Sequence, residues 1–596
     1  GTDLRVARRG FMQLAGAGVV AGTATGFAQA EAAVPTAPVT ELVSGEMTTA
    51  DILIEAAIAF GATHAFGIVG DGINPLIEAL RKRQDRIAFV GVRHEEAAAF
   101  MAAGMGKHGN RLGLCVATTG PGAVHLLNGL YDGAYDGAPI LALTGTTFHD
   151  LHGMRFMQSV NTIKLMEDVA LFNEEVTGPA HAVFIGNRAC RAALGGRGVA
   201  HLTIAKDVQA MHLSADKPST ENHGGRTSSI WQRPRPTPPA DQLLAAAALL
   251  NDGKKVAILA GQGCFGAEKN LVAVAEKLGA PIAKAYLAKA LLADDHPLTT
   301  GGIGHLGTLP SSWAMHNCDS VLILGSTMPW IDYYPKPGQA RGIQVDVKQD
   351  RIGLRYPVEI GLEGDVDATL AALLPLLQTK SDQSFLAETR TRMQDWAATL
   401  ERVEASPAGG KIKPQTAVKA LSDLAPANAM FSLDCGANTH FAARHTQIKA
   451  GQSWTGSGML VSMASGLPLA ISAALANPDR PSLAIVGDGG FAMLMAELST
   501  AVFNKLNVTV LILNNDALGE VKFEQKEIGN PEYGCALGHM DFAAYARSVG
   551  AYGVSVAALA DLRPAIQKAL AQPGPAVIDV QIDADVPALT PEKLNA

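Results

Sequence analysis

The stretch Leu483-Ala484-Ile485-Val486-Gly487-Asp488-Gly489-Gly490 decides the fold of this chain of 596 residues. Its apolar half predicts a buried strand, and the glycines that follow let the backbone approach an anion where the next helix begins. A second apolar run, Val508–Leu513, ends in Asn514-Asn515. Short apolar runs that alternate with helical stretches are typical of parallel α/β units.

Asp488 and Asn515 follow these two strands directly, so the same edge of a sheet would carry both side chains if the strands are neighbours. A carboxylate oxygen, an amide oxygen, a backbone carbonyl and diphosphate oxygens form the octahedral shell that Mg²⁺ prefers. Gly487, Gly489, Gly490 and Asn514 are the predicted cofactor-binding residues of this loop. A second Gly-Asp-Gly, at 70–72, is followed by no asparagine pair at the matching distance, and we do not predict a site there.

The same alternation extends over most of the chain and predicts three α/β domains, at 46–210, 240–375 and 411–596. A polar, proline-rich segment at 211–239 reads as a linker, and 376–410 reads as a linker helix. The expected strands are 65–69, 87–92, 114–117, 140–143, 202–204, 256–259, 321–324, 343–347, 483–486, 508–513 and 577–580.

Composition excludes several classes of protein. Hydrophobic residues make up 48% and charged residues 17%, which is incompatible with a disordered chain. A net charge of −8 offers no general attraction for nucleic acid or for an anionic membrane. The six cysteines form no C-x-x-C pair, so we expect buried free thiols and no zinc or dithiol centre.

The first 30 residues resemble a twin-arginine export signal. Arg8-Arg9-Gly10-Phe11-Met12 precedes a weakly apolar stretch that ends in Ala28-Gln29-Ala30, which resembles a cleavage site. Glycines and threonines dilute this stretch below the apolar character of a spanning helix, which disfavours the alternative of an uncleaved anchor. We therefore expect a soluble periplasmic protein with no stable membrane insertion after cleavage.

Gly487-Asp488-Gly489 with Asn514-Asn515 resembles the thiamine-diphosphate motif of the superfamily that contains decarboxylases, acetolactate synthases and pyruvate oxidases. Further segments follow in that family's order, namely Phe66–Gly70, Arg93–Glu96, Thr119–Gly122 and Asn128–Asp132. The resemblance covers nearly the whole chain after the signal. It implies three doubly wound parallel-sheet domains: a pyrimidine-binding, a central flavin-type and a diphosphate-binding domain.

The resemblance also implies roles for individual residues. Asp488, Asn515 and the carbonyl of Ala517 would hold Mg²⁺, and Met463 would be the apolar support that bends the cofactor. In this family the cofactor lies between domains of two subunits, so the resemblance implies a homodimer or homotetramer.

Glu95 matches the glutamate that, in this family, hydrogen-bonds the pyrimidine ring of thiamine diphosphate and activates the cofactor. First-turn glutamates are common in helices, and Glu96 is interpreted in that way. Gly120, in the Thr119-Gly120-Pro121-Gly122 turn, is a further predicted cofactor-binding residue.

Two positions bear on the substrate. Glu524 stands where pyruvate oxidases carry glutamate and acetolactate synthases carry tryptophan; its alternative is a solvent-facing helix glutamate. Gln158 matches the family's active-site glutamine. Met157 replaces the usual phenylalanine and Ser159 an acidic residue, which leaves the substrate size and the acceptor chemistry open.

Turns of the central segment resemble the flavin-binding positions of pyruvate oxidase and of the quinone-linked pyruvate dehydrogenase. Glycines at strand ends admit a pyrophosphate, and carboxylates there accept hydrogen bonds from ribose hydroxyls. The predicted FAD-binding residues are Gly263, Gly304, Ser326, Thr327, Asp346 and Asp365.

We therefore expect oxidative decarboxylation of pyruvate or a similar 2-keto acid, with thiamine diphosphate, Mg²⁺ and FAD, giving acetate or acetyl phosphate and CO₂. Three alternatives remain open: an acetolactate synthase-like carboligase with non-redox FAD, another 2-keto acid decarboxylase or lyase, and a catalytically silent cofactor-binding protein. The sequence leaves the electron acceptor undecided between O₂, a quinone and another compound.

Overall fold

The computed structural model describes residues 44–222, 231–407 and 409–595. The predicted twin-arginine motif and its cleavage site lie outside these residues. None of the helices in the described ranges combines the length and apolar character that crossing a bilayer requires. The six cysteines are free thiols, and all but the half-buried Cys435 are buried, as the sequence predicts.

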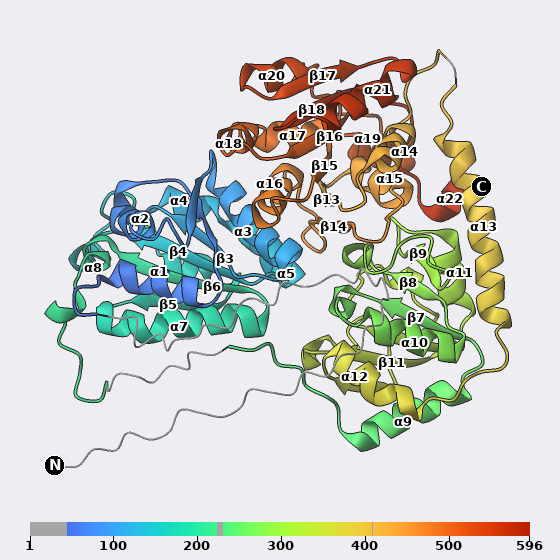
Figure 1. Cartoon of the computed structure of the whole chain (residues 1–596), viewed down its shortest axis with the longest axis horizontal. Helices are drawn as coiled ribbons and strands as arrows, with labels where there is room; N and C mark the ends of the chain where they lie inside the picture. Colours follow the sequence, from blue (N-terminus) through green and yellow to red (C-terminus); the bar gives the residue numbers. More distant parts are fainter. Residues whose placement is uncertain (1–43, 223–230, 408, 596) are drawn as a thin grey trace, which may run out of the picture.

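The chain folds into three α/β domains, each built on a six-stranded parallel sheet. In Figure 1 the N-terminal domain is blue to teal, the central domain is green to yellow and the C-terminal domain is orange to red. This confirms the predicted fold class.

The N-terminal sheet has the order β2-β1-β3-β4-β6-β5. Alternate residues of a strand face opposite sides, so Leu114 and Val116 of β3 pack under α1 and α7 while Cys115 and Ala117 pack under α3. The strands are β1 (His64–Gly67), β2 (Ala88–Gly91), β3 (Gly113–Ala117), β4 (Ile140–Thr146), β5 (Ala170–Val176) and β6 (Val199–Ala205). The helices are α1 (Thr49–Ala59), α2 (Asn74–Arg81), α3 (Glu95–Gly109), α4 (Pro121–His125), α5 (Leu127–Asp136), α6 (Thr162–Met166), α7 (Pro179–Gly196) and α8 (Lys206–Gln209).

The C-terminal sheet, β14-β13-β15-β16-β18-β17, repeats this topology: in both sheets the spatial order is second, first, third, fourth, sixth and fifth strand. The strands are β13 (Met430–Leu433), β14 (Ser453–Gly456), β15 (Ser482–Gly487), β16 (Val508–Asn514), β17 (Tyr552–Val556) and β18 (Ala576–Gln581). The helices are α14 (Pro414–Leu424), α15 (Ala437–His445), α16 (Gly466–Ala476), α17 (Asp488–Leu494), α18 (Glu497–Phe503), α19 (Gly519–Glu527), α20 (Phe542–Ser548), α21 (Leu559–Leu570) and α22 (Pro591–Asn595).

The central sheet has a different order, β12-β11-β10-β7-β8-β9. Counted from β7, this is 3-2-1-4-5-6 read in reverse, the order of dinucleotide-binding folds, whose ligand crevice opens between strands 1 and 4. The strands are β7 (Val256–Ala260), β8 (Ile282–Lys284), β9 (Thr299–Gly302), β10 (Ser320–Leu324), β11 (Arg341–Asp346) and β12 (Ile360–Glu363). The helices are α9 (Ala240–Asp252), α10 (Glu268–Leu278), α11 (Leu309–Asn317) and α12 (Val366–Leu373).

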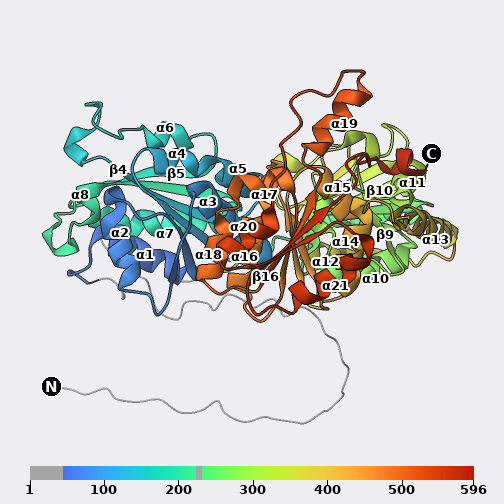
Figure 2. The same ribbon diagram turned by 90° about the horizontal axis from the view of Figure 1, so that it is seen from above.

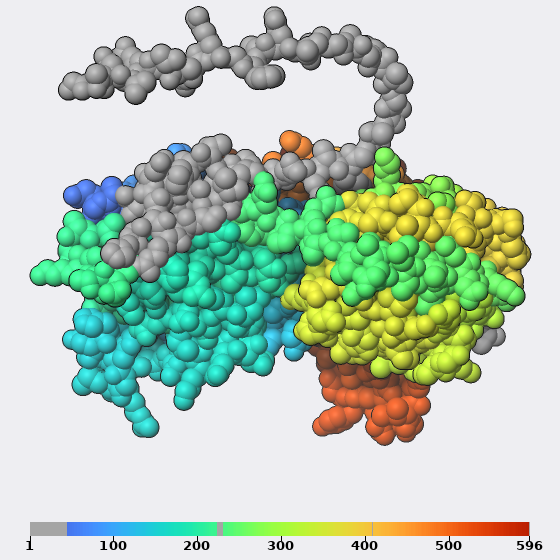
Figure 3. All heavy atoms as spheres, turned by 90° about the horizontal axis from the view of Figure 1, so that it is seen from below, coloured from blue at the N-terminus to red at the C-terminus, as the bar shows by residue number. Residues whose placement is uncertain are grey.

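Two segments connect the central domain to the others. The chain before α9 lies across the gap between the N-terminal and central lobes, shown in green in Figure 3, and Arg235 within it pairs with Asp365 and Asp367. The long helix α13 (Ser384–Glu404) runs along the edge of the molecule from the central to the C-terminal domain (Figure 1).

The N-terminal and C-terminal domains share one apolar core, in which α3 packs on α16. The helices approach so closely that a β-carbon on Gly104 would lie 1.9 Å from Oγ of Ser472. Glycine at this position therefore allows the close packing of the two helices.

A buried cation links all three domains. Lys107 Nζ of α3 lies 2.6 Å from Asp132 and 2.7 Å from Asp136, and it donates to the carbonyl of Gly456. Asp136 in turn accepts hydrogen bonds through its carboxylate from the C-terminal domain and through its carbonyl from Gln262 of the central domain. Burial lowers the pKa of Lys107, but the attraction of the two aspartates exceeds this effect and keeps it above its usual value. The amine is therefore charged.

Glu497 of α18 fixes the loop that precedes α3. Its carboxylate is fully buried and accepts hydrogen bonds from the backbone N–H groups of Arg93 (2.7 Å) and His94 (3.0 Å) and from the Thr500 hydroxyl. An anion from the C-terminal domain thus positions the N-terminal end of α3.

Replacing Glu497 with alanine should lower the free energy of unfolding by about 3 kcal/mol, because two buried N–H groups lose their acceptor. Glu497→Gln keeps one acceptor oxygen and should lose less. The exposed Glu388 of α13 is the control, since Glu388→Ala should stay within about 0.5 kcal/mol. Urea unfolding measures all three, and equal effects of Glu497→Ala and Glu388→Ala would contradict the role of Glu497.

Candidate active site

Asp488 and Asn515 lie at the ends of neighbouring strands. β15 pairs with β16 in a register that places Gly487 opposite Leu513, which confirms the expectation that these strands are adjacent. Asp488 begins α17, and its carboxylate accepts from the backbone N–H groups of Gly489 and Ala517. Burial raises the pKa of Asp488 to about 6, so the site favours a cation that restores the ionised form.

The loop after β16 supplies the other predicted metal ligands. Asn515 Oδ1 accepts from the N–H of Ala517 at 3.3 Å, so the Asn515 side chain lies against the residue whose carbonyl is the third predicted ligand. Asn514 points elsewhere: it is buried, and its amide donates to Asp579 of β18 at 2.9 Å. Asn514 therefore supports the loop through the sheet.

The glycines after Asp488 allow other side chains to pack closely against the start of α17. A β-carbon on Gly489 would lie 2.9 Å from Leu518 and 3.4 Å from the Met463 methyl group. A β-carbon on Gly490 would lie 2.8 Å from the Asp434 carboxylate, whose pKa burial raises to about 7. These close contacts, with an oxygen-only donor set at the start of a helix, fit a magnesium diphosphate group.

Met463 lies on a strained turn before α16. Val461 and Ala464, on either side of it, have φ values of 58° and 71°, a left-handed conformation that is costly for a β-branched residue. Ser462 accepts a hydrogen bond from Asn128 of the N-terminal domain at 2.8 Å. Strained backbone of this kind is common at functional sites. This favours the view that the turn holds the Met463 side chain in a fixed position.

Glu95 is the first residue of α3, with His94 as the N-cap. Its side chain is 9% exposed, and one carboxylate oxygen lies 2.9 Å from His125 Nδ1 at the end of α4. The other oxygen would lie 3.3 Å from a β-carbon on Gly122. Glu95 therefore faces the glycine turn that the sequence predicts to contact the cofactor.

Gly120 and Gln158 are in contact. Gly120 has a φ of +72°, and a β-carbon there would lie 2.7 Å from the carbonyl oxygen of Gln158. Gln158 itself has a φ of 61° and lies exposed in the segment after β4, beside the 72% exposed Met157. The structure thus brings Glu95, Gly120 and Gln158 to the carboxyl edge of the N-terminal sheet.

The two halves of the predicted site share a side of the molecule. Figure 2 shows α4 and α6 on the same side as α19, which carries the exposed Glu524. Within the described ranges, no hydrogen bond or ion pair joins Glu95 to Asp488 or Asn515.

In the central domain, two glycines bring the chain after β7 into contact with the chain after β10. The N–H of Gly263, after β7, donates to the carbonyl of Gly325, after β10, at 3.2 Å, and a β-carbon on Gly263 would lie 2.7 Å from the Gly325 Cα. Ser326 and Thr327 follow at once, the serine buried and the threonine half-buried. The strand order of the sheet reverses between β7 and β10, and a dinucleotide-binding fold holds its pyrophosphate at that point. The half-exposed backbone of these glycines fits such a group.

The remaining predicted flavin positions lie on the same edge. Gly304 has a φ of +94° and packs under the Trp330 ring. Burial raises the pKa of Asp346, at the end of β11, where it accepts from the Lys348 N–H. Asp365 instead caps α12 by accepting from the N–H of Ala368, so its carboxylate is partly used by the fold.

The sequence-based reasoning missed four residues of the two half-sites. Asp434 and Asn438 follow β13, which the sequence did not predict, so no strand end marked them; Asn438 Oδ1 would lie 3.3 Å from a β-carbon on Gly487. Glu497 lies within α18, and nothing in the sequence marks its contact with the loop before α3. His125 could have been found from the sequence, because it lies on the short helix that begins at Pro121-Gly122, next to the predicted cofactor-binding turn.

Family models match all three domains. The N-terminal TPP binding domain of thiamine pyrophosphate enzymes matches residues 47–165, the central domain matches 243–373 and the C-terminal TPP binding domain matches 434–580. The chain belongs to the thiamine pyrophosphate enzyme family.

Relatives cover nearly the whole chain of this thiamine pyrophosphate enzyme. YdaP of Bacillus subtilis, whose name marks it as thiamine pyrophosphate-containing, is 39% identical over 91% of this chain and 92% of its own. Pyruvate oxidase of Lactiplantibacillus plantarum is 29% identical over 91% and 90%. Acetolactate synthase isozyme 1 large subunit of Escherichia coli is 28% identical over 90% and 94%.

Asp488→Asn should weaken magnesium-dependent binding of thiamine diphosphate by about 100-fold or more, because a charged metal ligand is lost. The matched control is Asp71→Asn in the other Gly-Asp-Gly, where Asp71 is exposed and pairs with Lys206 at 3.1 Å. Calorimetric titration with the cofactor measures both variants. Equal affinities of the two variants would contradict the metal site.

Proposed function

We propose that this enzyme catalyses oxidative decarboxylation of pyruvate or a similar 2-keto acid, with FAD as the electron relay and acetate or acetyl phosphate and CO₂ as products. Glu524 is the main support for this proposal. It lies on α19, which follows the predicted metal loop, at a position where pyruvate oxidases carry glutamate. The similarity to pyruvate oxidase supports the same choice.

Thiamine diphosphate, when bound, would supply the nucleophilic carbon and the electron sink for decarboxylation, and FAD would accept the two electrons. Asp488, Asn515 and the carbonyl of Ala517 would hold Mg²⁺ and so fix the diphosphate end. Met463 would hold the bend of the cofactor.

Glu95 would hold and exchange one proton at its carboxylate. The side chain is nearly buried, so few water molecules compete for its hydrogen bonds. Glu497, through the backbone N–H groups of Arg93 and His94, keeps the start of α3 in place. Gln158, exposed beside Gly120, would bind the polar groups of the substrate.

A carboligase of the acetolactate synthase type, with non-redox FAD, is the second candidate. The similarity to acetolactate synthase favours it, and that relative is nearly as similar to this chain as pyruvate oxidase is.

We propose a homodimer or homotetramer, because the resemblance places the cofactor between two subunits and, among the described residues, no hydrogen bond or ion pair joins Glu95 to Asp488 or Asn515. Large exposed apolar side chains on the C-terminal domain support a partner: Met493 is 59% exposed, Phe503 79% and Tyr533 86%. The twin-arginine motif supports export to the periplasm as a soluble protein.

Glu95→Gln should leave cofactor binding within about threefold and slow exchange of the C2 proton of bound thiamine diphosphate by about 100-fold or more, because the amide cannot take part in proton exchange. The neighbouring Glu96→Gln is the control, since Glu96 hydrogen-bonds Asn128. Hydrogen–deuterium exchange followed by NMR measures both variants. Unchanged exchange in Glu95→Gln would remove this role.

Anaerobic addition of pyruvate to the enzyme with both cofactors should bleach the flavin absorbance, because the electrons of decarboxylation reach FAD. Product analysis should find acetate or acetyl phosphate. An unchanged spectrum with formation of acetolactate would contradict the oxidase and support the carboligase.

A further inference from the structure

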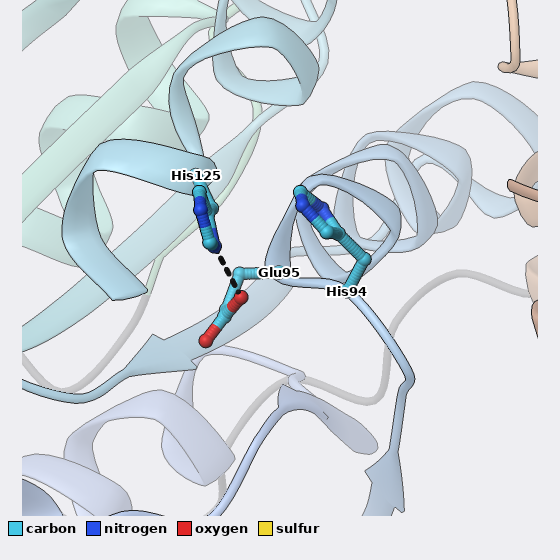
Figure 4. Close-up of side chains that lie close together, drawn as sticks. All are labelled: His94, Glu95 and His125. Carbon is cyan, nitrogen blue, oxygen red and sulfur yellow. Dashed lines mark hydrogen bonds and ion pairs between the residues drawn. The ribbon is translucent and has the colours of Figure 1, made fainter. Parts of the chain in front are cut away.

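His94, Glu95 and His125 form a cluster in which one ligand atom of each residue lies within 4.8 Å of the others. Figure 4 shows His125 pointing at the Glu95 carboxylate, with the His94 ring beside them. The two imidazole rings stack at 4.4 Å between centroids with an interplanar angle of 28°.

The donor set differs from that of the predicted magnesium site. Two imidazoles and one carboxylate are typical ligands of zinc, which binds nitrogen and oxygen and leaves a fourth position for water. Asp488, Asn515 and the Ala517 carbonyl offer only oxygen, which suits Mg²⁺. The chain therefore carries two sites of different chemical preference.

The cluster is partly assembled and open to solvent. His94 Nδ1 accepts from the N–H of Glu96 at 3.1 Å, which fixes the ring as an N-cap and leaves Nε2 as the free nitrogen. The side chains of His94 and His125 are 40% and 45% exposed, so an ion and its water can enter.

The distances require only a small adjustment. Zinc bonds of about 2.1 Å in a tetrahedral shell place ligand atoms about 3.4 Å apart. His125 Nδ1 and Glu95 are 2.9 Å apart, and the His94 ligand atom lies within 4.8 Å of both, so it must approach by up to about 1.4 Å. Rotation of the half-exposed His94 side chain provides this movement and gives up its hydrogen bond from the Glu96 N–H.

We propose that His94, Glu95 and His125 bind a borderline divalent cation such as Zn²⁺, separately from the magnesium site. The bound ion captures the carboxylate of Glu95 and so inhibits the enzyme. The inhibition rests on the proposed function, whereas the binding does not.

The binding test uses the full chain, stripped of metal, without thiamine diphosphate and with Mg²⁺ in large excess. Titration with Zn²⁺ against a chromophoric chelator should show a site that His125→Asn or His94→Asn weakens by about tenfold or more. His149→Asn is the matched control, because His149 pairs with Asp207 alone and is 66% exposed. The titrations use a Cys435→Ser background, since the other five thiols are buried.

Cobalt absorption gives a second readout, since Co²⁺ in the site should show the bands of a nitrogen-ligated ion, and these should disappear in His125→Asn. Equal zinc affinity in wild type, His125→Asn and His94→Asn would overturn the site. Zinc binding at the cluster without slower C2 proton exchange would overturn the inhibition alone. If zinc does not bind but pyruvate still bleaches the flavin, the zinc site is wrong and the proposed function stands. If zinc binds but pyruvate does not bleach the flavin, the proposed function is wrong and the zinc site stands.

Discussion

The pairing of β15 with β16 is the constraint on which the rest of the molecule depends. Parallel strands in register end at one edge, so Asp488 and Asn515 meet there although a helical segment separates them in the sequence. A shift of one residue in the register would turn one of the two side chains to the opposite face of the sheet. The central, fully buried position of both strands fixes this register.

The repeated topology of the outer domains explains how a second half-site can exist. The N-terminal and C-terminal sheets share one strand order, and the equivalent helices α3 and α16 pack against each other in a common core. Glu95 begins α3, and Met463 lies just before α16. Glu95 and Met463 thus stand at corresponding places in two copies of one topology, and Glu497 and Lys107 link the two domains.

The sequence predicted the fold class well, because buried central strands such as β4 and β16 are continuous apolar runs. It missed seven strands. β5 (ALFNEEV), β9, β12, β14 and β17 lie at sheet edges, and the interior strands β8 and β13 are only three and four residues long. An edge strand is paired on one side only, so its sequence needs fewer apolar residues.

The candidate site was predicted where residues are adjacent to a recognisable strand end, as for Asp488 and Asn515. The surroundings of Glu95 could not be predicted in the same way. His125 reaches Glu95 from another helix, and Glu497, from another domain, accepts hydrogen bonds from the backbone just before Glu95. Asn514 shows the reverse: it belongs to the motif, yet its side chain bonds to Asp579 within the sheet. A sequence motif identifies the loop, and the structure decides which of its side chains face the ligand.

Equilibrium titration of the metal-free chain with thiamine diphosphate, in the presence and absence of Mg²⁺, is the sharpest test of a metal site at Asp488 and Asn515. We expect saturable binding of one cofactor per chain that requires the cation. Absence of binding at any magnesium concentration, or equal binding without it, would show that these residues form no such site.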